Sequence, residues 1–179
     1  MHFQDLGFEP RYLATVEPGL PGTGTVHQFS TGHRRNNPEG VVVRVNAGGS
    51  EWVGNFEGDD GGTFIACATP SPNHICVVSA GQAFVVNVNN PNDFEIVPIS
   101  PVRQVLPMTD LQMLLLADDA RIASYGPSGR LWRTGVLGSD ELRINREGNL
   151  LTGEVWDAAL GRVRQFRIDP ASGEILAHS

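Results

Sequence analysis

Ionisable side chains that could bind a cation or an anion lie in the connections between strand-like runs of this sequence. Aspartate carboxylates from several separate loops are the oxygen ligands that calcium prefers, and a histidine followed by two arginines presents positive charge to a partner. The same aspartates also suit a purely structural role, because Asp caps its own backbone in turns. The residues proposed for ligand or partner binding are His33, Arg34, Arg35, Asp59, Asp60, Asp118, Asp119, Asp140 and Asp157.

The sequence contains no signature from which a catalytic residue can be assigned. The segment 126–129 lacks the Gly-x-Ser-x-Gly spacing of a hydrolase nucleophile, and 22–24 lacks the third glycine of a dinucleotide-binding loop. We therefore expect a non-catalytic binding or assembly module that presents a loop-rich, acidic face to a protein partner or to another copy of itself. The alternative is a metal-dependent hydrolase that uses the same face. No cofactor is predicted except, for that alternative, calcium or another divalent cation.

Two cysteines, Cys67 and Cys76, flank the turn 70–73 symmetrically. This spacing predicts cross-strand neighbours whose sulfur atoms are close together. A disulfide across directly opposed strands is geometrically awkward, so two buried free thiols are expected. A zinc site would need two more ligands, and His74 is the only histidine nearby.

Composition indicates many short strands. Among 179 residues, 21 are Gly and 12 are Pro, while charged residues make up only 18%. The net charge of -7 argues against a nucleic-acid partner. No apolar run is long enough to span a bilayer, and the amino terminus does not resemble a secretory signal. Membrane binding is therefore not predicted, and a cytoplasmic location is the default expectation.

A strand–turn–strand pattern recurs through the chain, at 41–56, 83–99, 121–135 and 163–176, with starts 42, 38 and 42 residues apart. Two further strand-like runs precede each of these hairpins. The sequence therefore predicts four tandem four-stranded antiparallel units in one domain, at about 8–57, 63–99, 102–137 and 141–177.

Turn chemistry supports this register, because Gly129 and Gly173 fall where a hairpin turn needs a positive φ. Thr109 to Gln112 has the form of a helix capping box, so 110–120 also suits a helix. We favour a strand over 113–117, since it falls in step with the second unit. Trp52, Trp132 and Phe94 are expected to pack between units. The expected core positions are Val43, Ile65, Val77, Phe84, Val86, Leu115, Ile122, Ile144 and Phe166.

The outer hairpins at 129–134 and 166–176 resemble blades of the β-propeller superfold, in particular its quinoprotein-like and lactonase-like branches. The resemblance covers the whole chain in period and about 20 residues in motif. It implies a small or partial β-propeller in which the second-to-third-strand and unit-to-unit connections share one face. It also makes the hydrolase alternative lactonase-like, although no metal-binding residue of that branch can be matched here.

A Trp-Asp dipeptide and the number of units both bear on the propeller resemblance. Trp156 and Asp157 spell the dipeptide of WD-repeat proteins, but they end the second strand of a unit rather than the third, so membership of that family is not assigned. Four units are the low end for a closed ring. Closure by side-chain packing alone, pairing of two chains, and truncation from a longer protein are all open.

Overall fold

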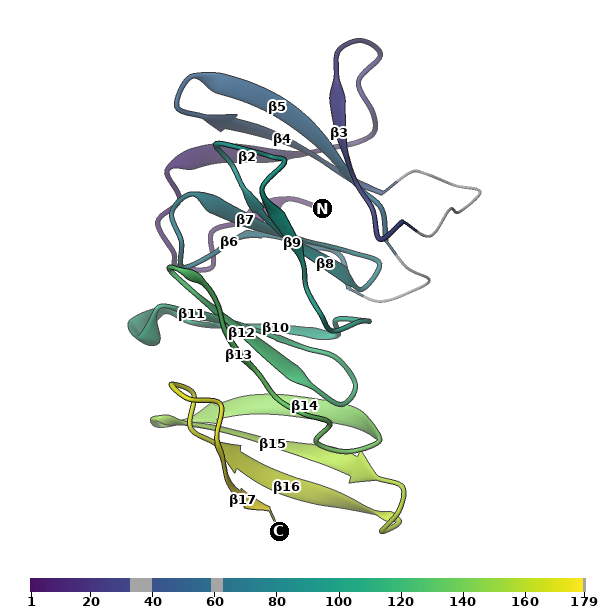
Figure 1. The fold of residues 1–179 in the computed structure, drawn as a ribbon, viewed down its shortest axis with the longest axis vertical. Helices are drawn as coiled ribbons and strands as arrows, with labels where there is room; N and C mark the ends of the chain where they lie inside the picture. The colour runs from purple at the N-terminus through teal and green to yellow at the C-terminus, as the bar shows by residue number, and fades with distance from the viewer. Residues whose placement is uncertain (33–39, 59–62, 179) are drawn as a thin grey trace.

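The computed structural model describes residues 1–32, 40–58 and 63–178, and within these ranges the chain is all-β. Four separate sheets follow one another in chain order along the long axis of the molecule, the first and the fourth at opposite ends (Figure 1). None of the four sheets closes on itself. The all-β class and the four strand-rich units are as predicted.

The first sheet differs from the simple meander expected for its unit. It contains β2 (Tyr12–Glu17), β3 (Val26–Phe29), β4 (Val41–Ala47) and β5 (Ser50–Phe56), in the order β2-β4-β5-β3. Because β4 and β5 form a tight hairpin and β2 occupies the free edge of β4, only the outer edge of β5 remains for β3. Strand β3 therefore pairs with β5, and the two strands run parallel.

The second sheet gains a strand that lies outside the predicted units. Its order is β1-β6-β7-β8-β9, and β1 (Phe3–Gln4) pairs parallel with β6. The other strands run antiparallel: β6 (Ile65–Ala68), β7 (His74–Ser79), β8 (Gln82–Asn87) and β9 (Phe94–Ile96). The start of the chain thus reaches past the first sheet to the second.

The third and fourth sheets are antiparallel meanders, as predicted. The third contains β10 (Gln104–Met108), β11 (Met113–Ala117), β12 (Ile122–Gly126) and β13 (Gly129–Arg133). The fourth contains β14 (Asp140–Glu147), β15 (Leu150–Asp157), β16 (Arg162–Ile168) and β17 (Ile175–His178). The strand interpretation of 113–117 is confirmed, and only a short 3-10 helix, η1 (Thr109–Leu111), precedes it. Gly129 and Gly173 have φ of +106° and +73°, as their turns require.

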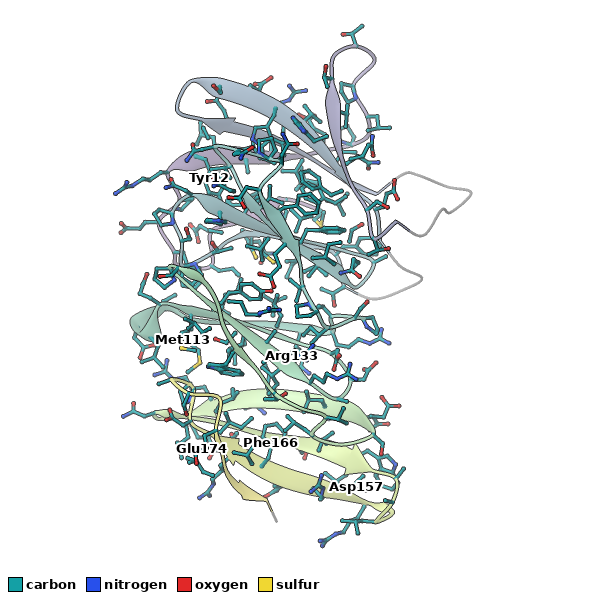
Figure 2. All side chains as sticks on the ribbon, in the orientation of Figure 1. Tyr12, Met113, Arg133, Asp157, Phe166 and Glu174 are labelled. Carbon is teal, nitrogen blue, oxygen red and sulfur yellow. The ribbon has the colours of Figure 1, made fainter. Side chains whose placement is uncertain are left out.

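The core consists of three apolar clusters, one between each pair of successive sheets, and side chains fill these spaces (Figure 2). Strand residues alternate between the two faces of a sheet, so each inner sheet contributes to two clusters and each end sheet to one. Eight of the nine predicted core residues are buried. The exception is Ile65, which is half-buried because it begins β6 at the rim of its cluster.

The two cysteines lie directly opposite each other on β6 and β7, and both are free and fully buried. This confirms the predicted cross-strand pair. A hydrogen bond with Cys76 and burial both raise the pKa of the Cys67 thiol well above its ordinary value. Cys67 therefore stays protonated, and both buried side chains behave as small apolar groups.

Candidate functional site

The predicted binding surface corresponds to one edge of the stack of sheets. The connections at 118–121, 134–139 and 157–161 lie along the same side of the molecule (Figure 1), and Asp157 marks its lower end (Figure 2). Backbone hydrogen bonds tie neighbouring connections together, from Leu142 N to Asp119 O and from Ser139 N to Trp156 O. Of the predicted residues, His33, Arg34, Arg35, Asp59 and Asp60 lie outside the described ranges.

Asp118 serves the turn in which it lies. Its side chain is buried, and Oδ1 accepts hydrogen bonds from the backbone N–H groups of Ala120 at 2.7 Å and Arg121 at 2.5 Å. Its other oxygen is 3.6 Å from the Arg121 guanidinium. The carboxylate is thus engaged by its own chain.

The other described aspartates of this edge are engaged in the same way. Asp119 accepts hydrogen bonds from the Arg103 guanidinium, at 3.2 Å and 3.3 Å. Asp140 accepts one from the N–H of the next residue. Asp157 accepts two from the turn that follows it and lies 2.8 Å from Arg164 Nε. Within the described residues, no group of three or more His, Cys, Asp or Glu side chains is arranged to hold a metal ion.

A second candidate surface is the outward face of the fourth sheet. Two apolar residues from each of β14, β15 and β16 pack toward the third sheet: Leu142 and Ile144, Leu151 and Val155, and Phe166 and Ile168. The alternate residues of the same strands must therefore point away from the molecule. Two rows of polar side chains follow from the strand register. One row holds Asn145, Thr152 and Arg167, and the next holds Arg143, Glu154 and Gln165.

A hollow of about 550 Å³ lies on this face. Four of the polar side chains that line it, Asn145, Thr152, Gln165 and Arg167, make no hydrogen bond to any other described residue. Their donors and acceptors face solvent and are free to meet a partner. The lining residues are Asn145, Glu147, Thr152, Gly153, Glu154, Gln165, Phe166 and Arg167.

One end of this face is apolar. Trp156 of β15 lies directly opposite Val163 of β16, and their side chains are 38% and 49% exposed. Arg143 and Glu154, in the neighbouring row, are 3.8 Å apart. We call this surface, made of Arg143, Asn145, Glu147, Thr152, Glu154, Trp156, Val163, Gln165 and Arg167, the fourth-sheet face.

Sequence reasoning missed the fourth-sheet face. Alternating polar residues such as Arg143, Asn145 and Glu147 are typical of a solvated strand face, so they attracted no functional interpretation. The available signal was Trp156, which alternates with Thr152 and Glu154 along the next strand, because a large aromatic side chain on a polar strand face is costly to leave in water.

No protein-family model and no curated protein sequence matches this chain. Among solved structures it is similar to the crystal structure of Myxococcus xanthus glutaminyl cyclase, at 13% identity and a TM-score of 0.31. The match covers 95% of this chain and 77% of that one. A similarity of this size carries no argument about activity.

The described residues contain no helix that is both long enough and apolar enough to cross a membrane.

Proposed function

We propose that this chain is a non-catalytic binding or assembly module that presents a sheet face to a protein partner. The observation that carries the proposal is the fourth-sheet face, where polar side chains that make no hydrogen bond to another described residue surround a hollow beside an exposed tryptophan. The fold we propose for the module is an open arc of four β-propeller units, with the two end faces uncovered.

The residue types of the fourth-sheet face suit protein recognition. Trp and Arg are the side chains most enriched among the residues that dominate binding energy, and this face holds Trp156, Arg143 and Arg167. Arginine is also the only strongly basic residue type in the chain, since its sequence contains no lysine. Arg loses less entropy per hydrogen bond than Lys and pairs with carboxylates through two parallel bonds.

The loop-rich edge has less support as a binding surface, because its described aspartates already bind their own turns or a neighbouring arginine. The same observation weakens the metal-dependent hydrolase alternative. A cation at Asp118 would have to displace two backbone hydrogen bonds and enter a site that is 3% exposed.

The test compares proteins captured from the source cells by the immobilised chain with those captured by Arg167→Glu and by Arg11→Glu. Arg11 is exposed and belongs to the first unit, so it is the matched control. A partner that is a different protein should be captured by the unmodified chain and by Arg11→Glu but lost with Arg167→Glu, and its purified form should bind with the same pattern. Unmodified copies of the chain itself are left out of this comparison, because they can still bind an Arg167→Glu bait through their own fourth-sheet face. Equal capture of a different protein by both variants would contradict the proposal, as would turnover of an ester or lactone by the purified chain.

A further inference from the structure

The first sheet, like the fourth, leaves much of one face uncovered, although Val42, Val53 and Asn55 of that same face are buried. The apolar residues on the other face of this sheet pack toward the second sheet, among them Tyr12, Val43, Val45, Trp52 and Phe56. The alternate residues face outward, and we call the surface formed by Leu13, Thr15, Glu17, Arg44, Asn46 and Glu51 the first-sheet face. It lies at the end of the molecule opposite the fourth-sheet face (Figure 1).

We propose that the partner of the fourth-sheet face is a second copy of this chain, docked through its first-sheet face. This inference rests on the proposed function and names its partner. The two faces differ, so the contact is heterologous. Each copy binds the first-sheet face of the next copy, which we call the head, through its own fourth-sheet face, which we call the tail.

Continuity with the packing inside the chain supports this docking. The same packing occurs three times within the chain, because each sheet packs one face against the adjacent face of the sheet that follows it. A fourth-sheet face laid on the first-sheet face of another copy continues that series. The two surfaces left over at the ends of the stack are therefore the two that the repeat would bring together.

The charge distribution supports head-to-tail docking over tail-to-tail docking. Of the 20 acidic residues, 13 precede residue 121, whereas 8 of the 13 arginines lie from Arg121 onward. The first part of the chain is thus strongly acidic and the last part slightly basic. Such an asymmetry orients two copies head to tail as they approach and disfavours pairing of two acidic ends.

The individual side chains allow ion pairs between the two faces, although the fourth-sheet face is formally neutral, because it holds Glu147 and Glu154 beside its two arginines. On the first-sheet face one guanidinium, Arg44, lies between two carboxylates, 2.7 Å from Glu17 and 2.6 Å from Glu51, which leaves one excess negative charge. On the fourth-sheet face Arg167 has no carboxylate partner among the described residues, and Arg143 is held only at 3.8 Å. These two guanidinium groups are available to the carboxylates of another copy.

An apolar contact is also available on each side. Leu13 is 78% exposed on the first-sheet face, and Trp156 with Val163 is exposed on the fourth. The rest of both faces is polar, unlike the three apolar clusters inside the chain. The association should accordingly be weak, reversible and sensitive to salt.

The experiment measures mass by sedimentation equilibrium for the full chain and two variants. The tail variant carries Arg143→Glu and Arg167→Glu, and the head variant carries Leu13→Arg and Glu51→Arg. All four positions are exposed, and the ion pairs lost with Arg44 and Glu154 are surface pairs that contribute little, so both variants should stay close to the thermal stability of the unmodified chain, which a melt verifies. We expect the unmodified chain to associate with rising concentration between about 5 µM and about 1 mM, and each variant alone to bind itself at least about tenfold more weakly.

Mixing the two variants decides between docking modes. The tail variant keeps an intact head and the head variant keeps an intact tail, so a one-to-one mixture should form heterodimers. A strictly monomeric unmodified chain would overturn the inference. Undiminished self-association of the head variant would also overturn it, because the contact would then join two fourth-sheet faces. If the chain is monomeric but Arg167→Glu still loses a captured protein, the proposed function stands and only the identity of the partner is wrong.

Discussion

The indole Nε1 of Trp132 donates a 2.8 Å hydrogen bond to the carbonyl oxygen of Pro170. Trp132 belongs to β13 of the third sheet, and Pro170 to the turn between β16 and β17 of the fourth. Trp52 of the first sheet makes the same 2.8 Å contact with Val88, in the turn between β8 and β9 of the second. A tryptophan thus ties the last hairpin turn of a sheet to the sheet before it, at two of the three junctions.

The middle junction, between the second and third sheets, uses charge instead. Glu95 of β9 accepts a 3.0 Å hydrogen bond from the Tyr125 hydroxyl and lies 3.0 Å from the Arg130 guanidinium. The predicted packing role of Trp52 and Trp132 is confirmed by these contacts. Phe94 is 39% exposed but packs edge-on against Phe29, with ring centroids 5.1 Å apart.

Replacing either tying tryptophan by phenylalanine should weaken the junction. Trp132→Phe and Trp52→Phe keep an aromatic ring but remove the indole N–H donor, and each should lower the free energy of unfolding by about 1–2 kcal/mol. Urea denaturation followed by circular dichroism measures the change. The control is Trp156→Phe, because Trp156 makes no hydrogen bond through its indole nitrogen to a described residue and should change stability by less than about 0.5 kcal/mol. Equal losses in all three variants would refute the role of the indole N–H.

Residue 153 of β15 must be glycine, because neighbouring atoms leave no room for a side chain there. A Cβ atom there would lie 2.2 Å from the carbonyl oxygen of Arg143 and 2.4 Å from the ring of Phe166. Gly153→Ala should therefore cost about 2 kcal/mol or more, since neither the β14 backbone nor the packed ring can move freely. Gly135→Ala is the matched control, with no atom within 4 Å of its added Cβ. Thermal melts of both variants give the comparison, and a neutral Gly153→Ala would show that β14 and β15 separate easily.

The buried cysteine pair should resist modification in the folded protein. Both side chains are fully buried, and the raised pKa of Cys67 keeps its thiol protonated and unreactive. Mass spectrometry after brief maleimide treatment should find no adduct under native conditions and two adducts in denaturant. Rapid labelling without denaturant would mean that the second sheet opens on that timescale.

Stability should fall as the solution is acidified through the titration range of histidine. Burial lowers the pKa of His74 below its ordinary value, although nearby Asp93 opposes this shift. The unfolded chain therefore takes up a proton before the folded protein does, so stability is complete above about pH 6.5 and declines as pH falls toward the folded-state pKa. The expected readout is a lower urea midpoint at about pH 5.5 than at pH 7.5.

His74→Gln serves as the control for this pH dependence. Its side chain does not titrate, so the decline between those two pH values should shrink. Asp110, whose pKa is lowered by hydrogen bonds from Arg146, contributes only at more acidic pH. An unchanged decline in His74→Gln would assign the effect to other groups.

The regular part of the fold could be predicted from sequence because turn residues and strand period agree there. Gly129 and Gly173 mark equivalent turns, and Cys67 and Cys76 lie symmetrically about another, which fixes register over most of three sheets. These are local signals, carried by residues a few positions apart.

The remainder depends on contacts between distant segments. The two residues of β1 carry no strand signal of their own, and only the free edge of β6 makes them a strand. Nothing within β3 indicates that it would pair with β5 rather than with a sequence neighbour. For the candidate site, Asp118 and Asp157 could be located but not their hydrogen-bond partners, and the fourth-sheet face could not be recognised because polar alternation is equally typical of an ordinary exposed strand.

The packing of the four sheets also determines how readily each sheet unfolds locally. The second and third sheets pack against a neighbouring sheet on both faces, whereas the fourth packs on one face only, through the cluster around Leu151, Ile144 and Phe166. Local opening of the fourth sheet exposes one apolar cluster and leaves the other two intact, so its amide protons should exchange with solvent sooner than those of β7 or β11. A partner that binds the fourth-sheet face binds only its closed form and therefore slows that exchange. The proposed binding surface thus lies on a sheet whose order the partner itself helps to maintain.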